Sequence, residues 1–257
     1  RRPQDFQTAE TQKPPLPPYS PHCPFCAGNE AQTPPASYTL DADGRWKVRV
    51  FSNKFAALAN DIHFQLEPNG RFLKATGFGV AEVIVETPRH DLTLATLDDE
   101  AVEDVVRAYQ LRYLNAAGRP QINFVNLFRN HGVKAGTSLE HPHSQLIATP
   151  IIPPHVRNPI EQAVRYSDAS GRCLYCDMLA EEVRQKERII AETGYFIAYA
   201  PYASRTPFEV RVMPKNHRAS FGDIEAAELA DFARFMKNIL ARIYFGLRNP
   251  DYNFIIR

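Results

Sequence analysis

The sequence predicts an α+β protein made of two related halves, each an antiparallel sheet with helices packed on it. The four cysteines form two pairs of equal spacing, Cys23–Cys26 and Cys173–Cys176. Each pair is followed by segments in which apolar residues alternate, which is typical of strands, and then by an amphipathic stretch typical of a helix. The same order of features in both parts of the chain indicates a repeat.

The spacing of a Glu-Val dipeptide and a histidine supports this repeat. Glu82 precedes His90 by eight residues, and Glu209 precedes His217 by eight residues. A proline stands shortly before each histidine, and a short polar segment follows it. Two matched spacings within the same order of elements argue against chance similarity. We therefore expect one unit over residues 1–160 and a second over residues 161–257.

The expected elements follow from these patterns. Strands are predicted over 46–53, 121–128, 195–202 and 251–257, and helices over Leu97–Leu114 and Ile224–Ile243, each with an acidic first turn. The first half continues from its strand into HPHSQ, residues 141–145, whereas the second half stops at Arg257. The repeat predicts an equivalent strand after Arg257. Since the chain starts with Arg1 and not with methionine, we also expect sequence before it.

The composition argues against several classes of partner. A net charge of +1, with 44% hydrophobic and 23% charged residues, is ordinary for a globular protein and gives no field that would attract nucleic acid or a membrane surface. No apolar run approaches the roughly 20 residues that a membrane-spanning helix needs. No signal peptide is visible, and we expect a cytoplasmic protein.

The cysteine pairs are best interpreted as zinc half-sites, because a disulfide framework would need a secreted context. The first site would use Cys23, Cys26, His90 and one histidine of the HPH segment, and four ligands would make it a closed structural site. The second offers Cys173, Cys176 and His217, without a visible fourth ligand. The alternative is that the four cysteines are structural or redox-active thiols.

HPHSQ predicts chemistry because side chains two residues apart in a strand share a face. His141 and His143 would stand side by side, so that if one binds zinc the other is free to attack phosphorus and form a covalent intermediate. The Gln145 amide could donate to a phosphoryl oxygen where charge develops. The alternatives are that both histidines bind metal in a purely structural protein, or that a metal activates water for hydrolysis. Residues suited to hold phosphate or ribose are Gly136, Thr137, Ser138, Asn53 and Asn130.

Several motifs together resemble one known family. CPFCAGNE, VRVFSNKFAAL, EVIVETPRH, the glycine-rich run ending in HPHSQ, and APYASRTPFEVRVMPKNH are similar to galactose-1-phosphate uridylyltransferase and its relatives in the histidine-triad superfamily. The resemblance covers essentially the whole chain. It implies two histidine-triad-like halves, a homodimer, and a role in galactose metabolism. It also implies ping-pong transfer of UMP between UDP-glucose and galactose-1-phosphate, a hexose-1-phosphate, through a covalent nucleotidyl-histidine.

The resemblance also assigns roles to individual residues. It implies that His143 is the nucleophile and that His141 joins Cys23, Cys26 and His90 as a zinc ligand. Gln145 matches a glutamine that contacts the transferred phosphoryl group. Arg2 matches an arginine that reaches the nucleotide, across a dimer interface in the family. The remaining matches line the nucleotide site, and they are Asn53, Asn130, Gly136, Thr137 and Ser138.

Three departures leave the nucleotide open. Ser144 stands where uridylyl transferases often have glycine, and Thr137 stands where some members have cysteine. The second cysteine pair is present in only some members, among them relatives that transfer adenylyl groups. The alternatives are therefore an ADP-sugar phosphorylase or adenylyltransferase, a zinc-stabilised nucleotide-binding module without catalysis, and a histidine-triad hydrolase of dinucleoside polyphosphates.

Overall fold

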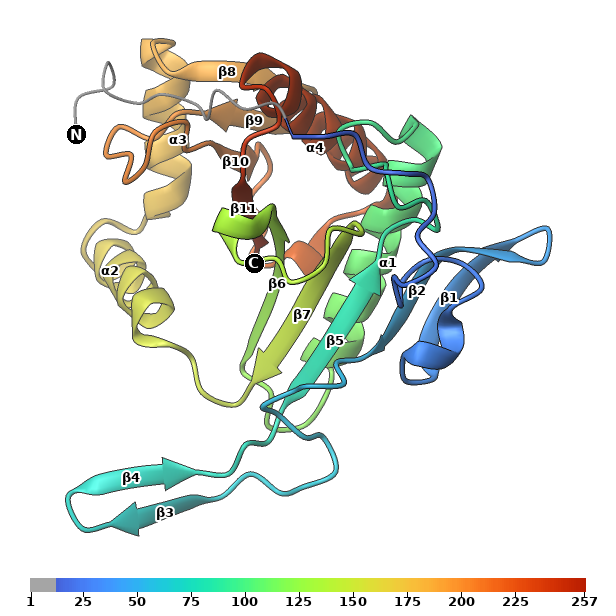
Figure 1. Ribbon diagram of the computed structural model, residues 1–257. Coiled ribbons are helices and arrows are strands. Elements are labelled where there is room, and N and C mark those ends of the chain that lie inside the picture. The colour runs from blue at the N-terminus through green and yellow to red at the C-terminus, as the bar shows by residue number, and fades with distance from the viewer. Residues whose placement is uncertain (1–12) are drawn as a thin grey trace.

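The computed structural model describes residues 13–257, and its largest element is a six-stranded antiparallel sheet (Figure 1). The strand order is β1-β2-β5-β7-β6-β11. Strands packed on helices confirm the predicted α+β class. The strands of this sheet are β1 (Ala36–Ala42), β2 (Arg45–Ser52), β5 (Val80–Val85), β6 (Phe124–His131), β7 (His143–Thr149) and β11 (Tyr252–Ile256).

Two smaller sheets accompany the large one. A three-stranded sheet of order β10-β9-β8 consists of β8 (Ile189–Glu192), β9 (Phe196–Tyr199) and β10 (Arg211–Pro214). A hairpin of β3 (Leu66–Asn69) and β4 (Phe72–Ala75) projects away from the body, and all its strand residues are exposed (Figure 1). The helices are α1 (Asp99–Ala117), α2 (Pro154–Ser170), α3 (Leu174–Gln185) and α4 (Ala226–Gly246).

The two predicted helices form α1 and α4, and both have strong N-terminal caps. The Asp98 carboxylate accepts a hydrogen bond of 2.7 Å from the Ala101 amide. In α4, Glu225 and Glu228 form a capping box, which satisfies two amides at the helix start. Helices α2 and α3 were not predicted. Val156 is the single buried residue of α2, so its sequence carries a weak signal of burial.

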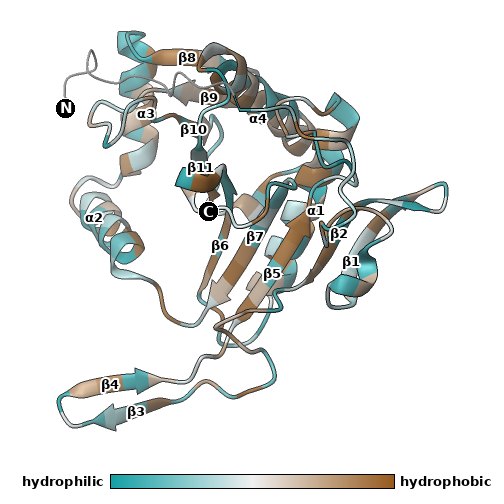
Figure 2. Ribbon diagram, viewed as in Figure 1, coloured by the Kyte–Doolittle hydropathy of each residue, from teal (hydrophilic) through white to brown (hydrophobic). Residues whose placement is uncertain are grey.

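The main core lies between the six-stranded sheet, α1 and α4. Alternate residues of the central strands point toward these helices and are fully buried, among them Val50, Ile84, Leu127 and Leu146. Figure 2 shows β5 and β7 as predominantly hydrophobic strands in the middle of the sheet. Because the pleat turns neighbouring residues to opposite faces, His143 and Gln145 of β7 lie on the face away from the helices.

The last strand of the second half belongs to the sheet of the first half. β11 pairs antiparallel with β6, with Asn253 opposite Asn130, and not with β10. Its alternate residues Tyr252, Phe254 and Ile256 pack against the main core, which explains why it adds to this sheet. The repeat predicts that this strand belongs to the sheet of the second half. In the structure it joins the sheet of the first half, so the two halves share one sheet. Among the described residues, no helix has the length and hydrophobicity needed to cross a membrane.

Candidate active site and metal centre

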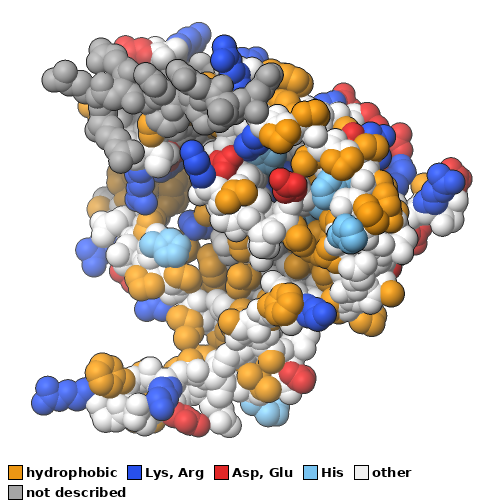
Figure 3. Space-filling view, viewed as in Figure 1, with side chains coloured by type: hydrophobic (Ala, Val, Ile, Leu, Met, Phe, Trp, Pro, Cys, Tyr) orange, Lys and Arg blue, Asp and Glu red, His pale blue; other side chains and the backbone are white. Residues whose placement is uncertain are grey.

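The face of the six-stranded sheet that carries His143 and Gln145 is here called the site face, and the cross-strand register shows which other residues lie on it. Arg49 of β2, Val85 of β5 and His143 of β7 lie directly opposite one another, so their side chains share a face. The next row along the strands contains Val83 and Gln145. The surface is hollowed between α2 and the sheet, where hydrophobic side chains gather (Figure 3). The site face is therefore open to a ligand on the side away from α1.

Four buried side chains converge beside this face, namely those of Cys23, Cys26, His90 and His141. The Cys26 sulfur lies 3.5 Å from His90 Nδ1 and 3.6 Å from His141 Nδ1, and the two nitrogens are 3.3 Å apart. Zinc bound at about 2.3 Å from sulfur and about 2.05 Å from nitrogen in a tetrahedron would put these atoms about 3.5 Å and about 3.3 Å apart. The observed spacings therefore fit zinc.

Hydrogen bonds prepare this group for a metal. His141 Nε2 lies 2.8 Å from the Thr87 carbonyl oxygen, which can only accept, so Nε2 carries the proton. Burial lowers the pKa of His141 to about 4, which keeps the ring neutral and leaves an Nδ1 lone pair facing the cysteines. A protonated outer nitrogen bonded to a carbonyl is the usual support for a ligand histidine. Asn29 holds the cysteine turn by donating to the Cys23 carbonyl at 2.8 Å.

A second, more exposed group consists of Cys173, Cys176 and His217. The Cys176 sulfur lies 3.2 Å from His217 Nδ1. Cys173 is the N-cap of α3, and the Cys176 amide lowers the pKa of its thiol. The structure thus brings together all three residues expected from the sequence, and this group contains no fourth ligand among residues 13–257.

His143 occupies a position suited to nucleophilic attack. Its Nδ1 lies 2.8 Å from the His141 carbonyl oxygen, so Nδ1 is the protonated donor and Nε2 keeps a free lone pair. Burial lowers the pKa of His143, whose side chain is 8% exposed, and so favours the neutral ring. The Phe25 ring contacts it edge-on, with centroids 5.2 Å apart. The imidazole is therefore neutral, and the Nδ1 hydrogen bond and the Phe25 ring orient it.

A buried polar cluster lies behind β7, on the helix side. Ser144 donates to Glu86 at 2.6 Å, and the Tyr109 hydroxyl donates to the same carboxylate oxygen at 2.7 Å. The guanidinium of Arg129 pairs with the other Glu86 oxygen and donates to Thr93 at 3.1 Å. Burial raises the pKa of Tyr109, which stays a donor. We name Glu86, Ser144, Tyr109 and Arg129 the buried cluster.

The other expected site residues have distinct positions. Asn53 follows β2, and its backbone amide donates to the Ala81 carbonyl of β5. Ala81 pairs with Ile147 of β7, which is four residues from His143. The Gly136 amide donates to Val133, and the Thr137 amide donates to Gly132, so these two groups are engaged within the loop. Ser138 has no such bond among the described residues. Arg2 lies outside the residues that the structure describes.

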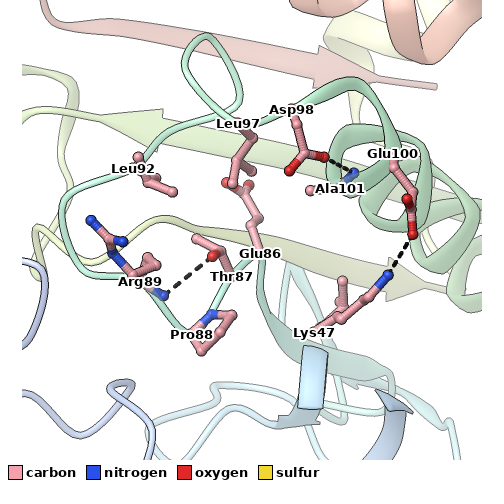
Figure 4. A pocket seen from close by; sticks show the side chains of 11 residues that line it. Lys47, Glu86, Thr87, Pro88, Arg89, Leu92, Leu97, Asp98, Glu100 and Ala101 are labelled. Atoms are coloured by element: carbon pink, nitrogen blue, oxygen red, sulfur yellow. Dashed lines mark hydrogen bonds and ion pairs between the residues drawn. The ribbon is translucent and has the colours of Figure 1, made fainter. Parts of the chain in front are cut away.

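A pocket beside the metal group is lined by Lys47, Glu86, Thr87 and Arg89 and by the start of α1 (Figure 4). Lys47 pairs with Glu100 at 2.7 Å, and Arg89 pairs with Asp91 at 2.7 Å. Glu86 belongs to the buried cluster. Since these cations already have carboxylate partners, the pocket lacks the unpaired positive charge that a phosphate would need, and the site face is the better candidate.

The sequence did not identify Glu86, Arg129 or Tyr109 as site residues. Glu82 and Ile84 of β5 alternate with Glu86, which directly follows the strand, and the other residues on this face of β5 are apolar. Charged residues in a buried alternation need partners, which was the available signal. The partners themselves, Arg112 for Glu82 and Arg129 for Glu86, come from other elements and could not be read from β5.

The fold and the site define an α+β protein in which a buried Cys₂His₂ group that could hold a metal ion lies next to an oriented histidine. Comparison with known proteins agrees with this class. The profile "Galactose-1-phosphate uridyl transferase, N-terminal domain" matches residues 1–153, and its C-terminal counterpart matches residues 159–247. The chain therefore belongs to the galactose-1-phosphate uridyl transferase family.

Two curated relatives show the range of the family. An ADP-glucose phosphorylase of Arabidopsis thaliana is 33% identical over 259 residues, which cover 100% of this chain and 72% of the relative. A galactose-1-phosphate uridylyltransferase of Thermotoga maritima is 28% identical over 204 residues, covering 79% of this chain and 64% of the relative. The chain thus spans about two thirds to three quarters of the length of these proteins.

Solved structures of both kinds of relative have the same fold as this chain. The crystal structure of the Arabidopsis thaliana ADP-glucose phosphorylase with bound ADP-glucose has a TM-score of 0.79 and 30% identity, and the match covers 97% of this chain and 76% of that one. A uridylyltransferase structure has a TM-score of 0.79 and 26% identity, covering 95% of this chain and 75% of that one. The architecture is shared with both kinds of enzyme.

Proposed function

We propose that this protein transfers a nucleotidyl group from a sugar nucleotide to a phosphate acceptor through a covalent intermediate on His143. The observation that carries the proposal is the orientation of His143, whose Nδ1 donates to the His141 carbonyl at 2.8 Å and whose Nε2 has no hydrogen-bond partner in the described part of the chain. Family membership supports it. Asn130, Ser138 and Gln145 would hold the phosphates, since the Gly136 and Thr137 amides already donate within their loop.

In the first step, the Nε2 lone pair of His143 attacks the α-phosphorus, and the bond from this phosphorus to the bridging oxygen breaks. The sugar-1-phosphate leaves with the electron pair of that bond. The ring becomes positively charged, and the His141 carbonyl accepting from Nδ1–H stabilises that charge, as in other histidine catalysts with an oriented ring. Gln145 lies two residues along the same face, and its amide would donate to a phosphoryl oxygen.

In the second step, a phosphate oxygen of the acceptor attacks the same phosphorus and the phosphorus–nitrogen bond breaks. His143 returns to its neutral form. Zinc bound by Cys23, Cys26, His90 and His141 would be a closed structural centre. These residues would hold the loop carrying Phe25 and the segment leading into His143 in place. We propose a second zinc at Cys173, Cys176 and His217.

Two nucleotides are candidates. The motifs led us to expect UMP transfer between UDP-glucose and galactose-1-phosphate. Two observations favour an adenylyl group, with ADP-sugar as donor. The Arabidopsis ADP-glucose phosphorylase matches 100% of this chain, and the chain has the second group of Cys173, Cys176 and His217, whose cysteine pair only some members of the family have, adenylyl-transferring relatives among them.

The test is the intact mass of the protein after incubation with ADP-glucose or with UDP-glucose, each without an acceptor. An AMP adduct from the first, or a UMP adduct from the second, identifies the nucleotide. Binding of nucleotide without an adduct would instead indicate a binding module, and release of free mononucleotide without an acceptor would indicate a hydrolase. We also propose a cytoplasmic homodimer, which light scattering of the purified protein would test.

A further inference from the structure

The glycine-rich loop before HPHSQ is anchored by Asp251, the residue that directly precedes β11. This loop, residues 132–138, contains a short 3-10 helix at Val133–Ala135. The Asp251 carboxylate accepts a hydrogen bond of 2.6 Å from the Lys134 amide. Gly132 has a φ of +90°, and a side chain there would overlap the Asp251 carboxylate. The second half therefore sets the position of a loop of the first half.

Asn253 makes two hydrogen bonds that together determine the orientation of the Asn130 side chain. Its Nδ2 donates to the Ala135 carbonyl at 2.8 Å and to Asn130 Oδ1 at 2.7 Å. The Ala135 carbonyl can only accept, so the amide nitrogen of Asn253 must point this way. Its other hydrogen then requires an acceptor on Asn130. The oxygen of the Asn130 amide, and not its nitrogen, must therefore face Asn253.

The consequence for Asn130 is a donor group that has no hydrogen-bond partner among residues 13–257. With Oδ1 engaged by Asn253, its Nδ2 is directed away from Asn253 and toward Gly136, where a Cβ would lie 3.7 Å from it. Asn130 shares a face with Phe128, which pairs with Gln145 of β7. An amide N–H₂ group is therefore presented on the face that carries Gln145 and His143, where a phosphoryl oxygen needs donors.

We infer that Asn253 is a positioning residue that orients the Asn130 amide as a donor to the phosphates of the nucleotide. The inference rests on the proposed function of His143. It assigns a role to the second half of the chain in a site whose other residues come from the first half. A carboxylate at position 253 could only accept, and it would turn the Asn130 amide so that its oxygen faced the phosphates.

The test is the rate of adduct formation in Asn253→Asp and Asn253→Ala, each alone and combined with Asn130→Ala. We expect Asn253→Asp to lower the rate about 10- to 100-fold, in line with the loss of one oriented donor, and Asn253→Ala to lower it less. With Asn130→Ala present, either change should alter the rate less than about twofold, because the group through which Asn253 acts is gone. Asn123→Asp, which adds the same charge directly before the start of β6, is the matched control.

The inference is overturned if Asn253→Asp reacts like the parent protein, or if its loss is the same in the Asn130→Ala background, as a through-space charge effect would require. Zinc content and thermal unfolding show whether each variant is folded, and the uncharged Asn253→Ala keeps the test valid if Asn253→Asp is not. If the parent protein itself forms no adduct, the proposed function fails. In that case, the affinity of the same single and double variants for a nucleoside diphosphate decides the role of Asn253.

Discussion

Ser144 donates a hydrogen bond of 2.6 Å to the buried carboxylate of Glu86. This links the strand that carries His143 to an ion pair on the opposite side of the sheet. Uridylyl transferases of the family often have glycine at the position of Ser144, and here the hydroxyl is fully buried and used. The residue that made the nucleotide uncertain in the sequence thus has a structural role of its own.

Replacing Ser144 with alanine should destabilise the protein measurably. The change removes one donor from a buried carboxylate, which corresponds to about 1.5–3 kcal/mol for hydrogen bonds to charged groups. Tyr109 and Arg129 still hold Glu86, so the variant should fold. Urea unfolding gives the free-energy change. Thr39→Ala, which removes an exposed hydroxyl bonded to Asp41, is the control and should change stability by less than about 0.5 kcal/mol. Equal effects at the two positions would refute the role of Ser144.

The two metal groups should differ in their effect on stability. Cys26 is fully buried in a four-ligand group, whereas Cys176 is exposed in a group of three. Cys26→Ser should lose one zinc and several kcal/mol of stability, because structural zinc contributes folding free energy. Cys176→Ser should lower stability much less. Zinc content and thermal unfolding of both variants provide the measurement, and an unchanged midpoint for Cys26→Ser would contradict a structural zinc centre.

The buried ion pair of Arg112 and Glu82 ties α1 to β5. Arg112 donates to the two carboxylate oxygens at 2.9 and 2.5 Å. Arg112→Met leaves a buried carboxylate unpaired and should cost about 3–5 kcal/mol. The double variant Glu82→Leu with Arg112→Met should recover most of this loss, since it removes both charges. Chemical denaturation of the single and double variants measures the recovery, and a double variant as unstable as the single one would show that the pair acts by other means.

The sequence predicted the features that depend on local pattern. The helices α1 and α4 follow from apolar periodicity with acidic caps. Spacing and repeat led to the expectation that Cys23, Cys26 and His90 meet one histidine of the HPH segment, the family resemblance implied that it is His141, and these four residues do come together. The pairing of β11 with β6 was not predictable, because an apolar strand does not specify which sheet edge it joins. For the same reason the sequence placed Asn253 only within the expected strand 251–257, and its contact with Asn130 depends on tertiary register.

The central claim is that His143 carries the nucleotidyl group. The most direct measurement is peptide mapping of the protein after incubation with ADP-glucose or UDP-glucose, under conditions that preserve a phosphorus–nitrogen bond. The predicted result is one adduct in the peptide containing residues 141–145, located on His143 and absent from His143→Ala, with zinc content unchanged. An adduct on another residue, or full exchange activity of His143→Ala, would contradict the account.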